Sequence, residues 1–326
     1  MRGAESAPVG RTGQPRHIPG MEGPPRPFDR RAHRSRRDRA AALVDRAEPL
    51  LAAVAERLLD RLDDTTRRFT RALDLGGRHG PLAAALMARG IPVVVSADLS
   101  PRMAARTDGL AVAADEEWLP FAPESFDLIV SSLSLHWVND LPGALIQARQ
   151  ALRPDGLFLA ILPGPATLAP LRAAFLAAEA ATAGGASPRV APLPDLRDAA
   201  SLLQRAGFAL PVADAETLTV TYPDPFALFA ELRALGETNA LAARSRRPAT
   251  RGLIAEAARR LPRDGEGRVA MPLELITLTG WAPAASQPKP LAPGSATARL
   301  AAALGAEEQG AGELAASRLA PPKPAR

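Results

Sequence analysis

From residue 71 onward, the chain alternates short apolar runs with stretches of helix-forming residues. The runs have the length expected of buried strands, and helical patterns lie between them. The candidate strands span 71–75, 92–98, 110–114, 126–132 and 156–162. The candidate helices between them lie near 80–89, 100–106 and 140–152. Short strands joined by helices run parallel, so this alternation predicts an α/β protein with helices on both faces of a sheet.

The rest of the chain adds helices at both ends of this core. Residues 28–69 contain two helical patterns, which we expect to pack on the core residues 70–165. Residues 166–281 are expected to complete the sheet. They hold helical stretches at 167–182, 195–206 and 224–260 and candidate strands at 216–222 and 273–281. We expect this pair of strands to add one antiparallel edge, with residues 223–270 forming a helical cover over a substrate pocket.

Composition excludes several kinds of chemistry. The chain has no Cys, so a disulfide framework, a thiolate zinc site, a cysteine-held iron–sulfur cluster and a cysteine nucleophile are all excluded. Its four His form no H-x-D/E pair of the kind used in two-His-one-carboxylate iron sites, and we predict no metal site. The net charge of +5 comes from an Arg-rich segment within residues 1–40, ahead of a nearly neutral body. Because stacking aromatics are also scarce, we do not expect a nucleic-acid partner.

The two ends of the chain are rich in Pro, Gly and Ala. Residues 1–27 and 282–326 are therefore expected to be disordered, and Met21 is a candidate alternative start. The first twenty residues lack the apolar segment of a secretory signal, and Pro and Gly interrupt any amphipathic transit helix. The apolar run 157–162 is far shorter than the ~20 residues of a membrane span. We expect a cytoplasmic protein without a membrane span.

A glycine-rich loop follows the first candidate strand. In ALDLGGRHG, Asp74 precedes Gly76, Gly77 and Gly80, and a helix begins just after them. Glycines allow positive φ and let a ligand approach the backbone closely. The loop departs from the dinucleotide pattern because Arg78 stands where the middle glycine is needed. An acid before the glycines suits a ligand that bears an amine better than it suits a pyrophosphate.

Two further acids end the next two strands. Asp98 follows the second strand, where a carboxylate can take both hydroxyls of a ribose. Asp115 follows the third and can accept from an exocyclic amine. An acid at a strand end is often only a turn residue or helix cap. Three of them in order, however, line the crevice where open α/β sheets bind ligands.

The order and spacing of these features resemble class I S-adenosylmethionine-dependent methyltransferases. The segment 114–158 carries the details of a small-molecule methyltransferase subgroup: LPF (119–121), FDLIVSS (126–132), LHWVND (135–140) and RPDG (153–156). Within that subgroup the chain resembles the complex I assembly factor 5 family, described as arginine hydroxylases. The shared pieces are FDRRAHRSRRDRAA (28–41), ADEEWLPF (114–121), SSLSLHWVNDLPGAL (131–145), GGASPRVAP (184–192), LLQRAGF (202–208), GETNA (236–240) and GSAT (294–297). The malonyl-carrier-protein methyltransferase of biotin synthesis is a more distant relative.

This resemblance implies a Rossmann-like, seven-stranded, mostly parallel sheet of order 3-2-1-4-5-7-6 and S-adenosylmethionine as cofactor. Residues of the glycine loop would surround its amino-acid part, Asp98 would hold the ribose, and Asp115 with Glu116 would bracket the adenine. Ser131 and Ser132 would floor the sulfonium pocket, and Arg30 and Arg31 would belong to a helix closing over the cofactor. The glycine-loop residues implied in this way are Asp74, Gly76, Gly77 and Gly80.

The chemistry itself leaves three functions open. Methyl transfer relies on positioning and desolvation, so it needs no visible catalytic base. His136, after the fourth strand, is a candidate base, although a structural role for it is equally in keeping with the sequence. We expect a methyltransferase acting on a small molecule or protein. The alternatives are an arginine hydroxylase acting on a complex I subunit and a non-catalytic assembly chaperone. Arg78 in the glycine motif favours the chaperone, because its side chain can crowd the cofactor.

Overall fold

The computed structural model describes residues 26–183, 185, 187–288 and 305. The compact unit described below ends at Ala285. The two ends expected to be disordered, 1–27 and 282–326, lie almost entirely outside the described residues, as does the GSAT segment at 294–297. Among the described residues, no helix is long and apolar enough to cross a membrane.

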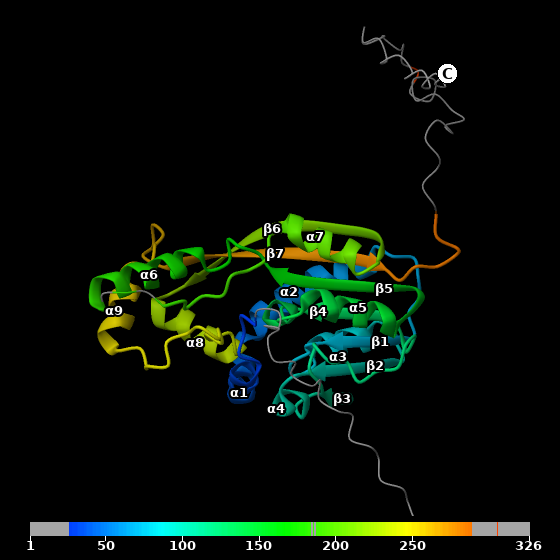
Figure 1. The fold of residues 1–326 in the computed structure, drawn as a ribbon, viewed down its shortest axis with the longest axis horizontal. Coiled ribbons are helices and arrows are strands. Elements are labelled where there is room, and N and C mark those ends of the chain that lie inside the picture. Colours follow the sequence, from blue (N-terminus) through cyan, green and yellow to red (C-terminus); the bar gives the residue numbers. More distant parts are fainter. Residues whose placement is uncertain (1–25, 184, 186, 289–304, 306–326) are drawn as a thin grey trace, which may run out of the picture. The chain divides into compact units, whose positions relative to one another are not determined.

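One sheet of seven strands organises the unit, in the order β3-β2-β1-β4-β5-β7-β6 (Figure 1). The order predicted from the sequence is confirmed. The strands are β1 (Arg71–Leu75), β2 (Val93–Asp98), β3 (Leu110–Ala113), β4 (Phe126–Ser132), β5 (Leu152–Pro163), β6 (Ala209–Tyr222) and β7 (Val269–Trp281). Strands β1 to β5 pair in parallel, whereas β7 is antiparallel to both β5 and β6. The antiparallel strand therefore lies one place in from the edge, which is formed by β6.

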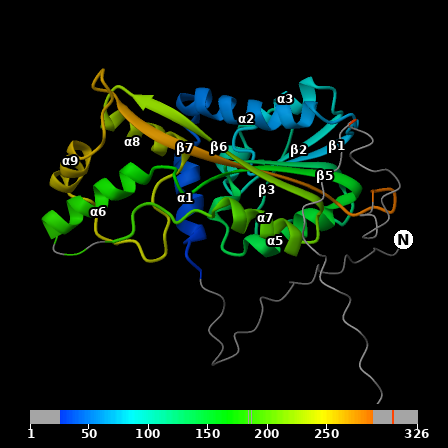
Figure 2. The ribbon, with the colours of Figure 1, turned by 90° about the horizontal axis from the view of Figure 1, so that it is seen from above.

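Helices cover both faces of the sheet. Figure 2 shows α2 and α3 on one side and α5 and α7 on the other. The helices are α1 (Arg30–Ala40), α2 (Glu48–Asp63), α3 (Pro81–Ala88), α4 (Pro101–Ala104), α5 (Leu141–Ala151), α6 (Ala169–Ala183), α7 (Leu196–Arg205), α8 (Pro225–Leu235) and α9 (Arg251–Arg259), with 3₁₀ turns η1 (Val44–Ala47) and η2 (Leu135–Trp137). The expected helical stretch 224–260 is thus two helices, because Gly236 takes a left-handed conformation (φ 78°) that ends α8.

Two apolar cores lie on opposite faces of the sheet. On one face Leu58 of α2 and Leu86 of α3 pack against strand residues such as Leu128. On the other, Leu145 of α5 and Leu203 of α7 belong to the cluster that contains Phe158. These side chains are fully shielded from solvent. Alternate residues of each central strand enter opposite cores, which explains why these strands read as continuous apolar runs.

A third core lies at the far ends of β6 and β7. There Leu171 of α6 and Leu228 of α8 pack with Met271 of β7. Figure 1 shows α6, α8 and α9 gathered at this end of the two long strands. This cluster forms the helical cover that the sequence predicts for residues 223–270, with α6 added to it.

Candidate active site

The glycine loop joins β1 to α3 and has almost no room for side chains. Gly76 and Gly80 have φ values of 76° and 87°, in the region that favours glycine. A Cβ on Gly76 would lie 2.1 Å from the Ser134 side chain, and one on Gly77 would lie 2.2 Å from the Ser96 hydroxyl. The loop therefore requires glycine at these positions on steric grounds as well as conformational ones.

Asp74 is a buried acid whose carboxylate is near enough to the backbone N–H of Ala83 to be stabilised by it, although the two groups do not meet the distance and angle of a hydrogen bond. Its side chain belongs to a residue only 1 % exposed, and neither carboxylate oxygen makes a hydrogen bond within 3.5 Å among the described residues. Burial, together with the nearby charge of Asp98, raises its pKa to about 7. The hydroxyls of Ser131 and Ser132 are also buried and unpartnered. Such groups cost free energy in a folded chain, and a polar ligand at this loop would satisfy them.

Asp98 has the opposite character, because its carboxylate is fully engaged. It pairs with the guanidinium of Arg37 from α1, and both side chains are completely buried. It also accepts the backbone N–H groups of Arg78 at 3.0 Å and Ser100 at 2.8 Å. The residue expected to hold a ribose is thus already occupied by a side chain of the protein.

The acids that follow β3 are engaged by α1 as well. Arg30 pairs with Asp115 at 2.5 Å and also with Glu116, which is fully buried. Ser134 donates a hydrogen bond to the other oxygen of Glu116, at 2.7 Å. Although burial opposes ionisation, Arg30 and Arg37 hold the pKa of Glu116 below its usual value. Glu116 is therefore a buried carboxylate paired with a cation.

Of the two α1 arginines expected at the site, one lies there and the other does not. Arg30 lies at Asp115 and Glu116, whereas Arg31 is exposed and does not reach the site. The buried side chains of α1 include His33 and Arg37. A helix advances 100° per residue, so positions 30, 33 and 37 share one face and 31 does not. The cation at the site that the sequence analysis missed is Arg37, and this i, i+3, i+7 spacing is the signal that could have found it.

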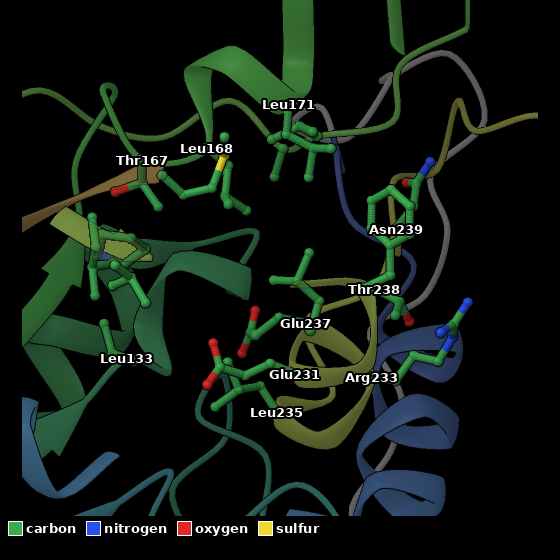
Figure 3. Close-up of a pocket in the computed structure, with 18 of the residues that line it drawn as sticks. Leu133, Thr167, Leu168, Leu171, Glu231, Arg233, Leu235, Glu237, Thr238 and Asn239 are labelled. Carbon is green, nitrogen blue, oxygen red and sulfur yellow. The ribbon is translucent and has the colours of Figure 1, made fainter. Parts of the chain in front are cut away.

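A cavity of about 270 Å³ opens beside the glycine loop. Its walls come mainly from η2, α6, α8 and the distal parts of β6 and β7, and most of them are apolar. In Figure 3 the side chains of Glu231 and Glu237 extend from the α8 region toward the side of the pocket where Leu133 lies, and Leu168 and Leu171 line another side. Glu231 accepts a hydrogen bond from the hydroxyl of Tyr222. We name this cavity the acceptor pocket.

Glu237, just after α8, gathers charged and polar side chains at the wall of the acceptor pocket. Its Oε1 accepts from Arg78 at 3.0 Å. Its Oε2 lies 3.0 Å from His136 Nε2 and accepts from Trp137 Nε1 at 2.5 Å. Burial opposes its ionisation, but His136 and Arg78 outweigh burial and hold the pKa of Glu237 well below the usual value. His33 of α1 stacks on Trp137 at 4.9 Å between ring centroids.

A methyltransferase-domain family model matches residues 35–211, more than half of the chain. The match covers β1 to β5, the glycine loop and most of the acids described above. The chain belongs to the methyltransferase-domain family. Its fold agrees with that assignment, because a candidate methyltransferase of Bacillus halodurans superposes with a TM-score of 0.50 at 15 % identity over 70 % of this chain and 99 % of that one.

Relatives of this methyltransferase-domain protein include proteins with two different names. It is 37 % identical over 279 residues to the human protein named arginine-hydroxylase NDUFAF5, mitochondrial, covering 83 % of this chain and 81 % of the relative. The zebrafish protein of the same name is 35 % identical over 283 residues, covering 84 % and 88 %. A malonyl-[acyl-carrier protein] O-methyltransferase of Laribacter hongkongensis is 37 % identical over 269 residues, covering 76 % and 88 %.

The residues of the methyltransferase-domain chain fit S-adenosylmethionine at one end of the site and compete with it at the other. Asp74 is a buried carboxylate that makes no hydrogen bond within 3.5 Å among the described residues, which suits an ammonium group. Asp98 and Glu116 have the chemistry to accept from ribose hydroxyls and an adenine amine. Here their partners are Arg37 and Arg30, so a nucleoside would have to replace those guanidinium groups.

Proposed function

We propose that the chain transfers a methyl group from S-adenosylmethionine to a small-molecule or protein acceptor held in the acceptor pocket. The observation that carries this proposal is the buried carboxylate of Asp74, which makes no hydrogen bond within 3.5 Å among the described residues. It lies at the glycine loop, and Arg78 of the same loop lines the acceptor pocket. Family membership and the malonyl-[acyl-carrier protein] O-methyltransferase relatives support it. A cytoplasmic location remains a prediction from the sequence.

The bound cofactor supplies an electrophilic methyl group on its sulfonium, which an acceptor lone pair attacks in line. The chain's own contribution is binding, orientation and exclusion of water. Asp74 binds the cationic ammonium, and its ionisation is favoured when that charge is present. The apolar pocket walls, among them Leu133 and Leu171, hold the acceptor away from water.

His136 is the candidate group for removing the acceptor's proton. Its Nε2 lies 3.0 Å from Oε2 of Glu237, the oxygen that also accepts from Trp137 Nε1. A neutral imidazole therefore places its proton on Nε2, where it donates to Glu237, and leaves the lone pair on Nδ1. That Nδ1 is buried and has no partner among the described residues. The pairing of His136 with Glu237 thus favours the tautomer with its proton on Nε2, which leaves Nδ1 able to accept a proton as a general base does.

Titration calorimetry with S-adenosylmethionine tests the cofactor site. We expect heat from the wild type and a large loss of affinity in Asp74→Asn, because the amide cannot neutralise the ammonium. Asp63→Asn is the matched control, since Asp63 pairs only with Arg89 at the surface of α2. No heat from the wild type at millimolar ligand would refute the methyltransferase proposal.

The second candidate function is hydroxylation of an arginine on a complex I subunit, and the third is assembly without catalysis. The identity of 35–37 % to the vertebrate arginine-hydroxylase relatives supports the second. Mass spectrometry of complex I subunits from a deletion strain separates the three. Loss of one oxygen on an arginine indicates hydroxylation, and loss of a CH₂ indicates methylation. Unchanged subunit masses with failed assembly indicate a chaperone.

A further inference from the structure

Arg78 adopts a backbone conformation that side chains normally avoid. Its φ is 56°, in the left-handed region, and the residue is only 3 % exposed. It stands at the middle position of the glycine motif, where glycine would adopt the same φ without strain. A long charged side chain at a strained, buried position requires compensating interactions.

Those interactions all lie on the acceptor side of the site. The guanidinium donates to the carbonyl oxygens of Leu235 at 2.5 Å and Leu133 at 3.0 Å, and to Glu237 Oε1 at 3.0 Å. All three partners line the acceptor pocket. Two of them belong to α8 and the segment just after it, which form part of the helical cover. The side chain of Arg78 therefore fastens the cover to the glycine loop.

The backbone of the same residue is fixed to the cofactor side. The N–H of Arg78 donates to Asp98 Oδ2 at 3.0 Å. Asp98 is the acid expected to exchange its guanidinium partner for a ribose when a cofactor enters. One residue thus bonds through its main chain to the cofactor acid and through its side chain to the pocket wall. The other carboxylate oxygen of Glu237 accepts from Trp137 Nε1 and lies within hydrogen-bond distance of His136 Nε2.

We infer that Arg78 is a positioning residue that couples occupancy of the glycine loop to the geometry of the acceptor pocket. The inference rests on the proposed cofactor. A change in the bonds of Asp98 shifts the Arg78 backbone, and the rigid guanidinium carries that shift to Leu235 and Glu237. In this chain the arginine that stands in place of the motif's glycine adds hydrogen bonds between the loop and the wall of the acceptor pocket. The same hydrogen bonds explain how the loop tolerates a residue other than glycine at this φ.

Hydrogen-exchange mass spectrometry of the full chain tests the coupling, with S-adenosylhomocysteine as the probe. The wild type should slow its exchange in 74–80 and also in 232–240, by about fivefold or more in the second segment, the lower end of typical coupling between sites. Arg78→Gly restores the conformationally free residue, so it should keep the effect in 74–80 and lose it in 232–240. Arg78→Lys keeps the charge but not the forked donors, and should transmit partially.

Arg89→Gly is the matched control, because Arg89 follows α3 and pairs only at the surface. It should behave as the wild type does. If Arg78→Gly fails to fold in a thermal melt, Arg78→Lys and Glu237→Gln carry the same comparison. The inference is overturned if the ligand protects 232–240 equally in the wild type and in the Arg78 and Glu237 variants. It is also overturned if the protection in the wild type is confined to 74–80. Parallel calorimetry separates the two proposals: heat without transmission refutes the coupling alone, whereas no heat refutes both.

Discussion

Arg37 of α1 and Asp98 at the end of β2 form an ion pair in which neither side chain is exposed to solvent. The pair joins the N-terminal helix to the acid that ribose recognition requires. A guanidinium and a ribose cannot both saturate this carboxylate, since the backbone N–H groups of Arg78 and Ser100 already take part of its capacity. If S-adenosylmethionine binds as proposed, α1 in the described conformation competes with its ribose for Asp98.

Arg37→Met should separate the two consequences of this pair. Removing one partner of a buried ion pair costs about 3–5 kcal/mol, so the unliganded protein should melt at a lower temperature. The freed Asp98 should then bind S-adenosylhomocysteine about tenfold more tightly, a gain of about 1.4 kcal/mol. Calorimetry and thermal melts measure both effects. Weaker binding in the variant would mean that Arg37 contacts the cofactor directly and does not compete with it.

Asp74→Asn should make the unliganded protein more stable at pH 8. The pKa of Asp74 is about 7 in the folded chain against 3.8 for a free side chain. Because the folded state holds this proton more tightly, its contribution to stability falls as the pH rises from about 4 to 7, by a few kcal/mol at most. Denaturant unfolding at pH 5 and pH 8 should show this decline in the wild type but not in the variant. An identical difference between the two proteins at both pH values would contradict the assignment.

Gly76→Ala, directly after β1, and Gly90→Ala, two residues after α3, form a matched pair. Both glycines have positive φ, 76° and 86°, so both substitutions introduce similar backbone strain, about 1 kcal/mol. A Cβ at Gly90 meets nothing within 4 Å, whereas one at Gly76 strikes Ser134. We expect Gly76→Ala to lose about 1–3 kcal/mol more than its partner in chemical denaturation. Equal losses would show that Ser134 moves without cost.

Glu237→Gln should change how stability responds to acid. The pKa of Glu237 is held well below 4.5 in the folded chain, so its stabilising effect is complete above about pH 4.5 and disappears as the pH falls further. The variant mimics the protonated acid at every pH. The difference in unfolding free energy between wild type and variant should therefore shrink between pH 5 and pH 3. A constant difference over that range would show that the charge of Glu237 is not what stabilises the cluster.

The strands and the acids that follow them were predictable from local sequence. Parallel strands have their carboxyl ends at one edge, so Asp74, Asp98 and Asp115 had to converge once the strand pattern was read. The order of β6 and β7 followed from the family resemblance. Their length did not: β6 begins at Ala209, seven residues before its predicted start, because Pro211 and Asp214 are residue types that strands disfavour.

The partners of the acids were not predictable in the same way. Arg37 stands in an Arg-rich segment whose composition suits a solvated helix, and its helical spacing from Arg30 points to the site only once Arg30 itself is placed there. Glu237 belongs to the GETNA motif, which the resemblance supplied without a role. Its function as a shared acceptor for Arg78, His136 and Trp137 depends on three segments meeting in space.

The long pairing of β6 with β7 separates the helices at its far end from the rest of the sheet. The helices at its far end have a core of their own, apart from the two cores that support the glycine loop. Mutations in this third core can change the walls of the acceptor pocket, and so the proposed acceptor, without changing the two cores that support the glycine loop. The third core and the glycine loop thus meet at the wall of the acceptor pocket, where Glu237 accepts from Arg78.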